Sequence, residues 1–266
     1  EEGDRNVEII DELREAALQS GGTFYLFYDR NQAIQGERNR TYELPSYIAD
    51  SDCRLTLYQN CRNTSAISQT SLTPLQLPQK RWSGSKVIDP WSVRVEKPVF
   101  HLLDDESLIV ETVNKVLDDL QAKDVTDIVL LTVGTMAYTA LRDGLESLDE
   151  GADKYWYYCY KRKRYRMTTA QRFKGLEATA IIMVDLKPDS FAGKNGMVFY
   201  VGASRAKLFL DFVAVIPEGE YKNVIQSVKE TEPVNKSAKR LRNVIQDLFH
   251  ARVEDTRLSS ISEMNP

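Results

Sequence analysis

Apolar residues in this chain fall into two kinds of run, which predict helices and strands that alternate along the sequence. Runs with an apolar residue every three or four positions indicate amphipathic helices. We expect such helices over residues 7–19, 64–72, 108–120, 136–148 and 198–206, and one more around 244–249. Short runs that are apolar throughout indicate buried strands. We expect these at residues 23–28, 55–58, 128–133, 180–184 and 208–215.

Strands of this kind that alternate with helices are typical of a parallel sheet covered on both faces. The sequence therefore predicts an α/β fold of the doubly wound type. After Pro217 the chain becomes polar and rich in Lys and Arg, and residues 259–266 are expected to fray.

Composition limits the class of protein. The chain has 266 residues, of which 42% are hydrophobic and 28% charged, the balance of an ordinary soluble domain. No apolar run approaches the roughly 20 residues that span a bilayer, so no membrane partner is expected. The net charge of −4 argues against a uniformly basic nucleic-acid-binding protein, but it is compatible with a local basic path. The chain begins without Met and without a signal-like segment, and we interpret it as a piece of a longer protein or a trimmed one.

The cysteines bear on metal binding and on the redox compartment. Cys53, Cys61 and Cys159 lack the CxxC spacing of a zinc site, and the chain has only two histidines. No zinc site is expected. An odd number of scattered cysteines is typical of a reducing compartment, so we expect a cytoplasmic protein.

Two stretches of the C-terminal half carry the most specific chemistry. Residues 169–177 read TAQRFKGLE and precede the apolar run 180–184. Residues 200–207 read YVGASRAK and precede another apolar run. Gly175 allows a tight turn or a close backbone approach. Taken by itself, Arg205 could be an arginine at the end of a helix that faces the helix dipole.

A third element lies near the start of the chain. Residues 27–32 read FYDRNQ, so that Asp29 and Gln32 follow an expected strand. In open α/β sheets the carboxyl end of a strand is where ligands bind, so these two side chains are candidates for ligand contact.

A fourth element follows the strand expected at residues 55–58. Residues 57–64 read LYQNCRNT, with Arg62 just before a helix start that Asn63 or Thr64 could cap. A guanidinium is permanently charged and bidentate, which suits it to phosphate. The alternative is a surface arginine beside a helix cap.

In chain order these four elements resemble motifs III, IV, V and VI of superfamily 1 helicases of the UvrD/Rep type, over roughly residues 24–215. The resemblance implies a RecA-like fold of the P-loop NTPase class and an ATP-dependent helicase. Enzymes of that family hydrolyse ATP while they move along nucleic acid. Their expected partner is single-stranded DNA or another nucleic acid.

The resemblance also implies a role for each matching residue. Catalytic contacts with the ATP phosphates fall to Gln32, Arg62 and Arg205. Nucleotide binding falls to Asp29, Lys174, Gly175 and Glu177, with the ribose bound by Glu177. Contacts with the nucleic acid fall to Thr169 and Arg172.

Half of the expected ATP site is absent from the sequence. There is no GxxxxGK[ST] loop and no acidic pair for Mg²⁺ ahead of motif III. In the family both precede motif III, so the resemblance implies a missing N-terminal motor domain that holds ATP and Mg²⁺. We expect the end of that first domain over 1–45, a second RecA-like domain over 46–216 and a polar helical tail over 217–266. Alone, the chain is expected to have neither ATPase nor unwinding activity.

Residues 155–166 read YWYYCYKRKRYR and interleave aromatic and cationic side chains. One interpretation is a nucleic-acid surface that includes Tyr160 and Arg164, since aromatic rings stack on unpaired bases and cations follow phosphates. The other is a strand or hairpin with buried tyrosines and solvated cations. Both interpretations remain open at the level of the sequence.

Two other functions compete with the motor. A non-motor module could use a degenerate helicase domain to bind nucleic acid or protein through residues 155–166 and the basic tail. The chain could also be an unrelated doubly wound nucleotide-binding domain, since a fold alone does not define a function.

Overall fold

The computed structural model describes residues 2–26, 59–60, 62–75, 86–87, 96–150, 153–229 and 237–255. The chain divides into two units, residues 1–57 and 58–266. The strand expected at residues 55–58 lies outside the described residues.

The first unit contains one described helix. Helix α1 (Glu2–Gln19) confirms the amphipathic helix expected over residues 7–19. It ends where Gly21 takes a φ of 71° and Gly22 N donates to Ala17 O at 2.8 Å, as is usual for a glycine-terminated helix. Residues 23–26 lie in irregular structure, so the strand expected at 23–28 is wrong over that part.

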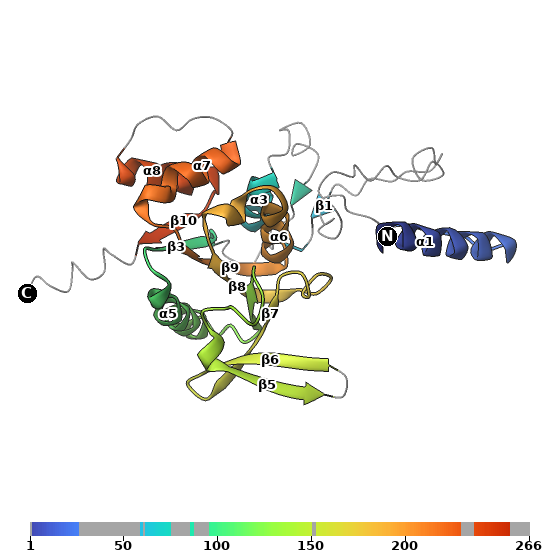
Figure 1. The fold of residues 1–266 in the computed structure, drawn as a ribbon, viewed down its shortest axis with the longest axis horizontal. Coiled ribbons are helices and arrows are strands. Elements are labelled where there is room, and N and C mark those ends of the chain that lie inside the picture. The colour runs from blue at the N-terminus through green and yellow to red at the C-terminus, as the bar shows by residue number, and fades with distance from the viewer. Residues whose placement is uncertain are drawn as a thin grey trace, which may run out of the picture. The chain divides into compact units, whose positions relative to one another are not determined.

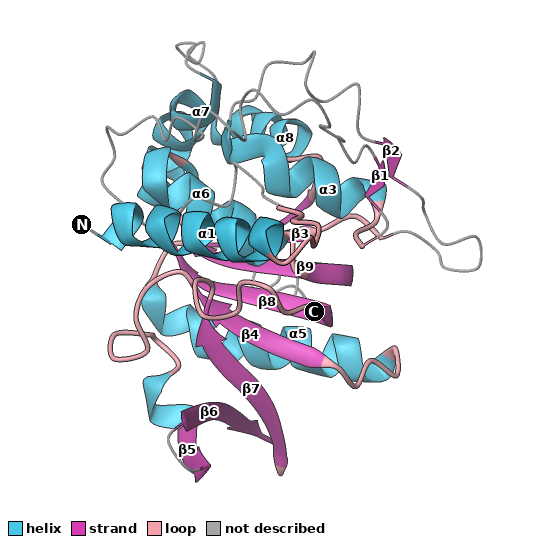
Figure 2. Cartoon of the chain, turned by 90° about the vertical axis from the view of Figure 1, so that its right-hand side faces the viewer, coloured by secondary structure: helices cyan, strands magenta, loops and turns pink. Residues whose placement is uncertain are grey.

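The second unit is built on an eight-stranded sheet in the order β10-β3-β9-β8-β4-β7-β6-β5 (Figures 1 and 2). The strands are β3 (Val99–Leu103), β4 (Ile128–Thr132), β5 (Leu145–Glu150), β6 (Asp153–Tyr160), β7 (Lys163–Thr169), β8 (Ala178–Leu186), β9 (Ala206–Val215) and β10 (Arg252–Asp255). From β10 to β7 every pair is parallel, and β6 and β5 extend the sheet as antiparallel strands. A two-residue parallel pair, β1 (Gln59–Asn60) with β2 (Lys86–Val87), stands apart.

Helices cover both faces of the sheet. They are α3 (Ser65–Leu72), α5 (Ile109–Ala122), α6 (Gly193–Ala203), α7 (Tyr221–Lys229) and α8 (Ala238–Leu248). Helix α5 lies on one face, and α3, α6, α7 and α8 contribute to the core on the other (Figure 1). The predicted α/β class with a mostly parallel sheet is thus confirmed.

Five phenylalanines form the centre of the core beneath α6 and α8. Their ring centroids are 4.4–6.4 Å apart, and none is more than 1% exposed. They are Phe100, Phe191, Phe199, Phe212 and Phe249. The residues come from β3, β9, α6, the turn before α6 and the end of α8, so this cluster joins the middle of the sheet to the C-terminal helices.

The expected elements nearest the middle of the sheet are confirmed, and one expected helix is wrong. Strands β4, β8 and β9 lie where the apolar runs predict them, as do α3, α5 and α6 within a few residues. Residues 136–148 instead form a turn-rich loop, a single short 3-10 turn at Arg142–Gly144 and the start of β5. The loop is fixed by Asp185, whose carboxylate accepts from Ala140 N at 3.1 Å and from Thr132 Oγ1 at 2.6 Å.

The chain after residue 216 contributes more than helices. Its α7 and α8 bury Val224, Ile225 and Ile245 in the core. Its last described strand, β10, pairs in parallel with β3 at the edge of the sheet. The expected fraying of residues 259–266 concerns a stretch outside the described residues. Within the described ranges no helix is long and apolar enough to cross a membrane.

Candidate nucleotide and nucleic-acid site

Three elements that are far apart in sequence meet at the amino ends of β8 and β9. Glu177 immediately precedes β8, and Arg205 immediately precedes β9. The first residues of these strands, Ala178 and Ala206, are register partners. The third element is the turn between β1 and α3, which carries Arg62.

Asn63 holds that turn against the start of β9. Its Nδ2 donates to Ser204 O at 2.9 Å and to Ala206 O at 2.5 Å, across 141 and 143 positions of sequence. The side chain is buried, so these bonds are shielded from competing water. The backbone that carries Arg62 is therefore fixed beside the backbone that carries Arg205.

The turn itself is ordered by two more polar side chains. Asn60 Oδ1 accepts from Arg62 N at 3.0 Å and from Asn63 N at 3.2 Å. Thr64 is the N-cap of α3 and accepts from Ile67 N at 3.4 Å, which decides between the two caps that the sequence allowed.

Glu177 lies between two cations. Its Oε2 is 3.3 Å from Arg62 Nε, and its Oε1 is 2.6 Å from Lys207 Nζ. The hydrogen bond from Lys207 is the main reason that the pKa of Glu177 is lowered. Desolvation opposes it as the next largest effect, and the positive charges of Lys207 and Arg62 lower the pKa further. All three side chains are 40–43% exposed, so a ligand from solution can reach them.

Arg205 occupies a different environment. Its side chain is only 2% exposed, and its Nε donates to Val201 O at 3.1 Å, one turn back in α6. The Nη2 atom is enclosed by protein. Contact between this guanidinium and a phosphate therefore requires the side chain to move out of the position it has here.

Lys174 and Gly175 precede Glu177 in an exposed turn. Gly175 has a φ of 91°, a conformation that side chains with a Cβ rarely adopt, and no atom within 4 Å would obstruct a Cβ there. The glycine is thus required by the backbone conformation rather than by close packing. Lys174 is exposed beside it.

The segment from Thr169 to Glu177 crosses one face of the sheet, from the carboxyl ends of the parallel strands to their amino ends. Thr169 pairs with Thr132 at the carboxyl end of β4. Glu177 precedes β8, whose Ala180 pairs with Ile128 at the amino end of β4. We call residues 169–177 the crossing segment. Its first residue lies at the carboxyl edge of the sheet, where the parallel strands end, and its last residue lies at the amino edge, where they begin.

The crossing segment is anchored by its own buried residues. Ala170 and Phe173 are no more than 2% exposed. A Cβ on Gly202 of α6 would lie 3.2 Å from Ala170 Cβ and 2.8 Å from Met183 Cε. The glycine thus permits α6 to pack closely on the crossing segment, so that the two stretches at residues 169–177 and 200–207 are in direct contact.

The predicted nucleic-acid residues fall into two groups. Thr169 Oγ1 accepts from Arg172 N at 3.2 Å, which brings these two residues together at the carboxyl edge, with Arg172 exposed. Tyr160 and Arg164 belong to the β6–β7 hairpin, where residues 159 and 164 are register partners. Because side chains alternate along a strand, Tyr160 and Arg164 point to opposite faces of the sheet.

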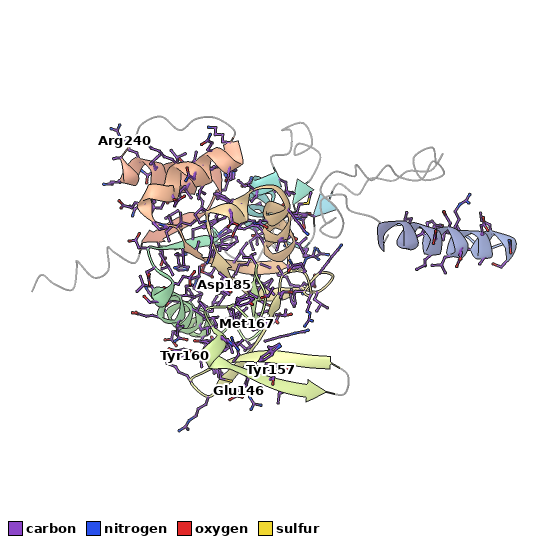
Figure 3. All side chains as sticks on the ribbon, viewed as in Figure 1. Glu146, Tyr157, Tyr160, Met167, Asp185 and Arg240 are labelled. Atoms are coloured by element: carbon purple, nitrogen blue, oxygen red, sulfur yellow. The ribbon has the colours of Figure 1, made fainter. Side chains whose placement is uncertain are left out.

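The contacts of the hairpin agree with that alternation. Tyr160 faces α5, where its hydroxyl donates to Asp118 Oδ2 at 3.0 Å (Figure 3). Arg164 is 56% exposed on the other face and pairs with Glu146 at 3.1 Å. The two residues therefore cannot belong to one stacking surface, and Tyr160 is accounted for by packing against α5.

Several expectations lie outside the described residues or were incomplete. Asp29 and Gln32 are not among the described residues. The sequence motifs indicated no role for Lys207, and for Asn63 they indicated only a possible helix cap, although both residues bond directly to the candidate site. Lys207 follows Arg205 by two positions at the start of a strand, and that spacing could have identified it.

No protein-family model matches the chain, and none of the curated proteins matches it. Across the described part of the chain, no three His, Cys, Asp or Glu side chains gather in a way that could hold a metal ion. A function for this chain must therefore be inferred from the geometry of the candidate site.

The lowered pKa of Glu177 gives a direct test of its pairing with Lys207. Ionised Glu177 contributes stability above its ordinary pKa, and this contribution is lost as the pH falls through the lowered pKa. In Lys207→Met we expect the pKa of Glu177 to rise toward its ordinary value, as measured by carbon NMR of the side-chain carboxyl. Lys194→Met, which removes an exposed lysine from α6, is the matched control. An unchanged Glu177 titration in Lys207→Met would contradict the assigned contact.

Proposed function

We propose that this chain contains the second RecA-like motor domain of an ATP-dependent helicase of the UvrD/Rep type. On this proposal, the chain closes over ATP whose phosphates and Mg²⁺ are held by a separate P-loop domain. The observation that carries the proposal is the pair of bonds from Asn63 to the start of β9, which join the Arg62 turn to the Arg205 junction. Three motifs that are separate in sequence thereby share one edge of the sheet.

The chemistry of this edge suits a nucleotide. Arg62 and Lys207 supply exposed positive charge for phosphate oxygens, and ionised Glu177 accepts hydrogen bonds from hydroxyl groups such as those of ribose. In phosphoryl transfer, negative charge develops on the transferred group, and an arginine held close to it stabilises that charge. Arg62 is accessible for this role, and Arg205 becomes available if its side chain leaves Val201 O.

The crossing segment supports a coupling between nucleotide and nucleic acid. Its Thr169 end carries a hydroxyl and the exposed Arg172, and its Glu177 end carries the nucleotide contacts. A displacement of Glu177 when ATP binds would be transmitted along a short segment fastened by Ala170 and Phe173. The proposal assigns to this segment the transmission of nucleotide state to the nucleic-acid contact.

One observation favours a second candidate function. Arg205 is buried, and Arg62, although exposed, is paired with Glu177, so each guanidinium must change its present contact to bind a phosphate. A non-motor domain that binds nucleic acid on the same scaffold would need neither arginine. Nucleotide binding at this edge separates the two functions.

Titration of the 266-residue chain with Mg·ATP, followed by nitrogen–proton NMR, tests the proposal. We expect saturable shift changes, with a Kd on the order of millimolar for half a site, at Arg62 Nε–H and at the amides of Gly175, Glu177 and Lys207. These changes should be lost in Arg62→Ala. Signals near His101, in the separate pocket beside β10, should not move.

Two outcomes would contradict the proposal. The first is the absence of saturable shifts at this edge of the sheet. The second is a set of shifts that Arg62→Ala leaves unchanged. If single-strand binding persists in either case, the non-motor function is the correct one.

A further inference from the structure

The turn that joins β6 to β7 has a backbone conformation that its residues do not favour. Tyr160 and Lys163 are register partners, so the loop between them has two residues, Lys161 and Arg162. Both have positive φ, at 46° and 63°. This is the pattern of a type I′ turn, for which Asn-Gly is the preferred pair because side chains with a Cβ are strained there.

The chain thus places two long cationic side chains where the backbone would favour asparagine and glycine. Residues held in such sparsely populated conformations occur disproportionately at functional sites. Lys163 and Arg164 follow directly, so four consecutive cations occupy the tip of the hairpin. We call residues 161–164 the hairpin tip.

Contacts with α5 hold most of the hairpin tip in place. Lys161 Nζ lies 2.7 Å from Asp118 Oδ1, and Lys163 Nζ donates to Gln121 Oε1 at 3.1 Å. Arg162 is exposed and forms no hydrogen bond or ion pair with any other residue that the structure describes. The backbone of the hairpin tip is therefore held in place by Lys161 and Lys163, while the guanidinium of Arg162 is exposed to a ligand.

The strand that begins at the tip continues the positive charge. Arg164 and Arg166 of β7 share one face of the sheet because they are two residues apart, about 6.6 Å along the strand. Strand β7 then ends at Thr169, at the carboxyl edge of the sheet, where the proposed function has its nucleic-acid contact. The row of cations thus leads from the hairpin tip to that edge.

The face that carries this row, which we call the open face, is exposed at the hairpin tip and partly covered at Arg166, whose Cζ lies 5.8 Å from the centroid of the Phe173 ring. None of the described residues of β5, β6 or β7 belongs to the core cluster on that side of the sheet, whereas Tyr158, Tyr165 and Met167 are buried toward α5. Tyr157, labelled in Figure 3, is the register partner of Arg166 and lies on the open face with it. An aromatic ring beside a row of cations matches the pattern of single-strand-binding surfaces.

We propose that the hairpin tip and the open face of β7 bind the phosphate backbone of a single-stranded nucleic acid, with Arg162 as the principal contact. A linear row of charge fits a linear polyanion better than it fits an isolated acidic group. Glu146 neutralises part of the charge of Arg164, so Arg162 carries the larger share of the positive charge that is available to a ligand. The proposal rests on the proposed function for the class of its ligand.

The turn itself provides a variant that removes charge while it relieves the backbone. Arg162→Gly removes the available guanidinium, and Lys161→Asn with Arg162→Gly installs the preferred type I′ pair. Arg162→Gly is not expected to lower the melting temperature, because glycine suits this conformation and Arg162 has no bond to another described residue to lose. The double variant also loses the contact between Lys161 and Asp118, so its melting temperature is measured beside its binding. A loss of binding could then not be attributed to loss of the fold.

Binding of a fluorescently labelled oligothymidylate to the 266-residue chain is measured over a series of salt concentrations. Each phosphate contact on a single strand contributes about 0.7 to the slope of log K against log salt. We expect Arg162→Gly to reduce that slope by about 0.7 and the double variant by up to about twice as much. Lys194→Ala, which removes an exposed lysine from α6, should leave the slope unchanged.

The outcomes separate this proposal from the proposed function. If Mg·ATP produces the expected shifts and Arg172→Ala weakens oligonucleotide binding, but the tip variants match the parent, the tip proposal is wrong and the motor function stands. If the tip variants weaken binding and Mg·ATP produces no shifts, the tip proposal stands and the motor function is wrong.

If the parent does not bind at low salt, both nucleic-acid assignments are wrong. If polyglutamate displaces the oligonucleotide as well as unlabelled oligothymidylate does, the tip is a protein-docking surface and the assignment to nucleic acid is overturned.

Discussion

Phe212→Ala is expected to lower the free energy of unfolding by about 3–5 kcal/mol, the usual cost of removing a fully buried aromatic side chain. Phe212 is fully buried, and its ring centroid lies 4.4 Å from that of Phe100 and 4.8 Å from that of Phe199. Removing it opens a cavity where the sheet, α6 and the C-terminal helices meet. Urea denaturation followed by circular dichroism measures the change.

Two companion variants sharpen this result. Phe212→Leu keeps most of the volume and should cost markedly less than the alanine variant. Phe209→Ala removes the same side chain from a partly buried position of the same strand, and it should also cost less. A loss below about 1 kcal/mol for Phe212→Ala would show that this aromatic cluster is not the centre of the core.

The middle of the sheet could be predicted from the sequence, because its elements follow simple periodicities. Strands β4 and β8 are uninterrupted apolar runs, and α5 has a continuous apolar face. In these cases the apolar residues whose burial stabilises the element belong to the element itself, so its own sequence predicts it.

The apolar pattern of the sequence does not predict strand β3, because the stability of this strand depends on residues far away in the sequence. His101 interrupts its apolar run, and its partners are Asp211 on β9 at 3.0 Å and Glu254 on β10 at 3.6 Å. A buried histidine is tolerated there only because neighbouring strands supply the carboxylates. Strand β10 was missed for the related reason that a four-residue polar strand is defined by its pairing with β3.

The failure at residues 136–148 has a similar cause. The apolar spacing there fits a helix, but Asp185 binds Ala140 N and stabilises a loop instead. Asp185 itself has a φ of 62°, so the strand that carries it is irregular at that point. A tertiary contact between residues 45 positions apart overrides the local preference.

For the site, the sequence identified the residues better than their environments. The motifs brought Arg62, Glu177 and Arg205 forward, and the structure places all three at one edge of the sheet. Sequence could not indicate that Arg205 is buried, because burial depends on how α6 packs. The sequence also could not indicate that Tyr160 and Arg164 lie on opposite faces of the sheet, since the register of the hairpin decides which face each side chain occupies.

The largest functional effect is expected at Arg205. In a motor that combines a P-loop domain with this chain, Arg205→Ala should reduce ATP turnover by about 10³-fold or more, the usual contribution of an arginine that stabilises the transferred phosphoryl group. Arg205→Lys should restore little of the activity, because an ammonium lacks the planar bidentate geometry of a guanidinium. Because Arg205 is buried, the melting temperature of each variant is measured alongside, so that loss of fold is distinguished from loss of catalysis.

ATP turnover, measured with and without single-stranded DNA, is the most direct test of the motor assignment. We expect no turnover by the 266-residue chain alone. The complete motor should show strand-stimulated turnover that is lost in Arg205→Ala and retained in Arg240→Ala, the exposed control on α8. Turnover by the 266-residue chain alone that is equal in the parent and in Arg205→Ala would contradict the motor assignment.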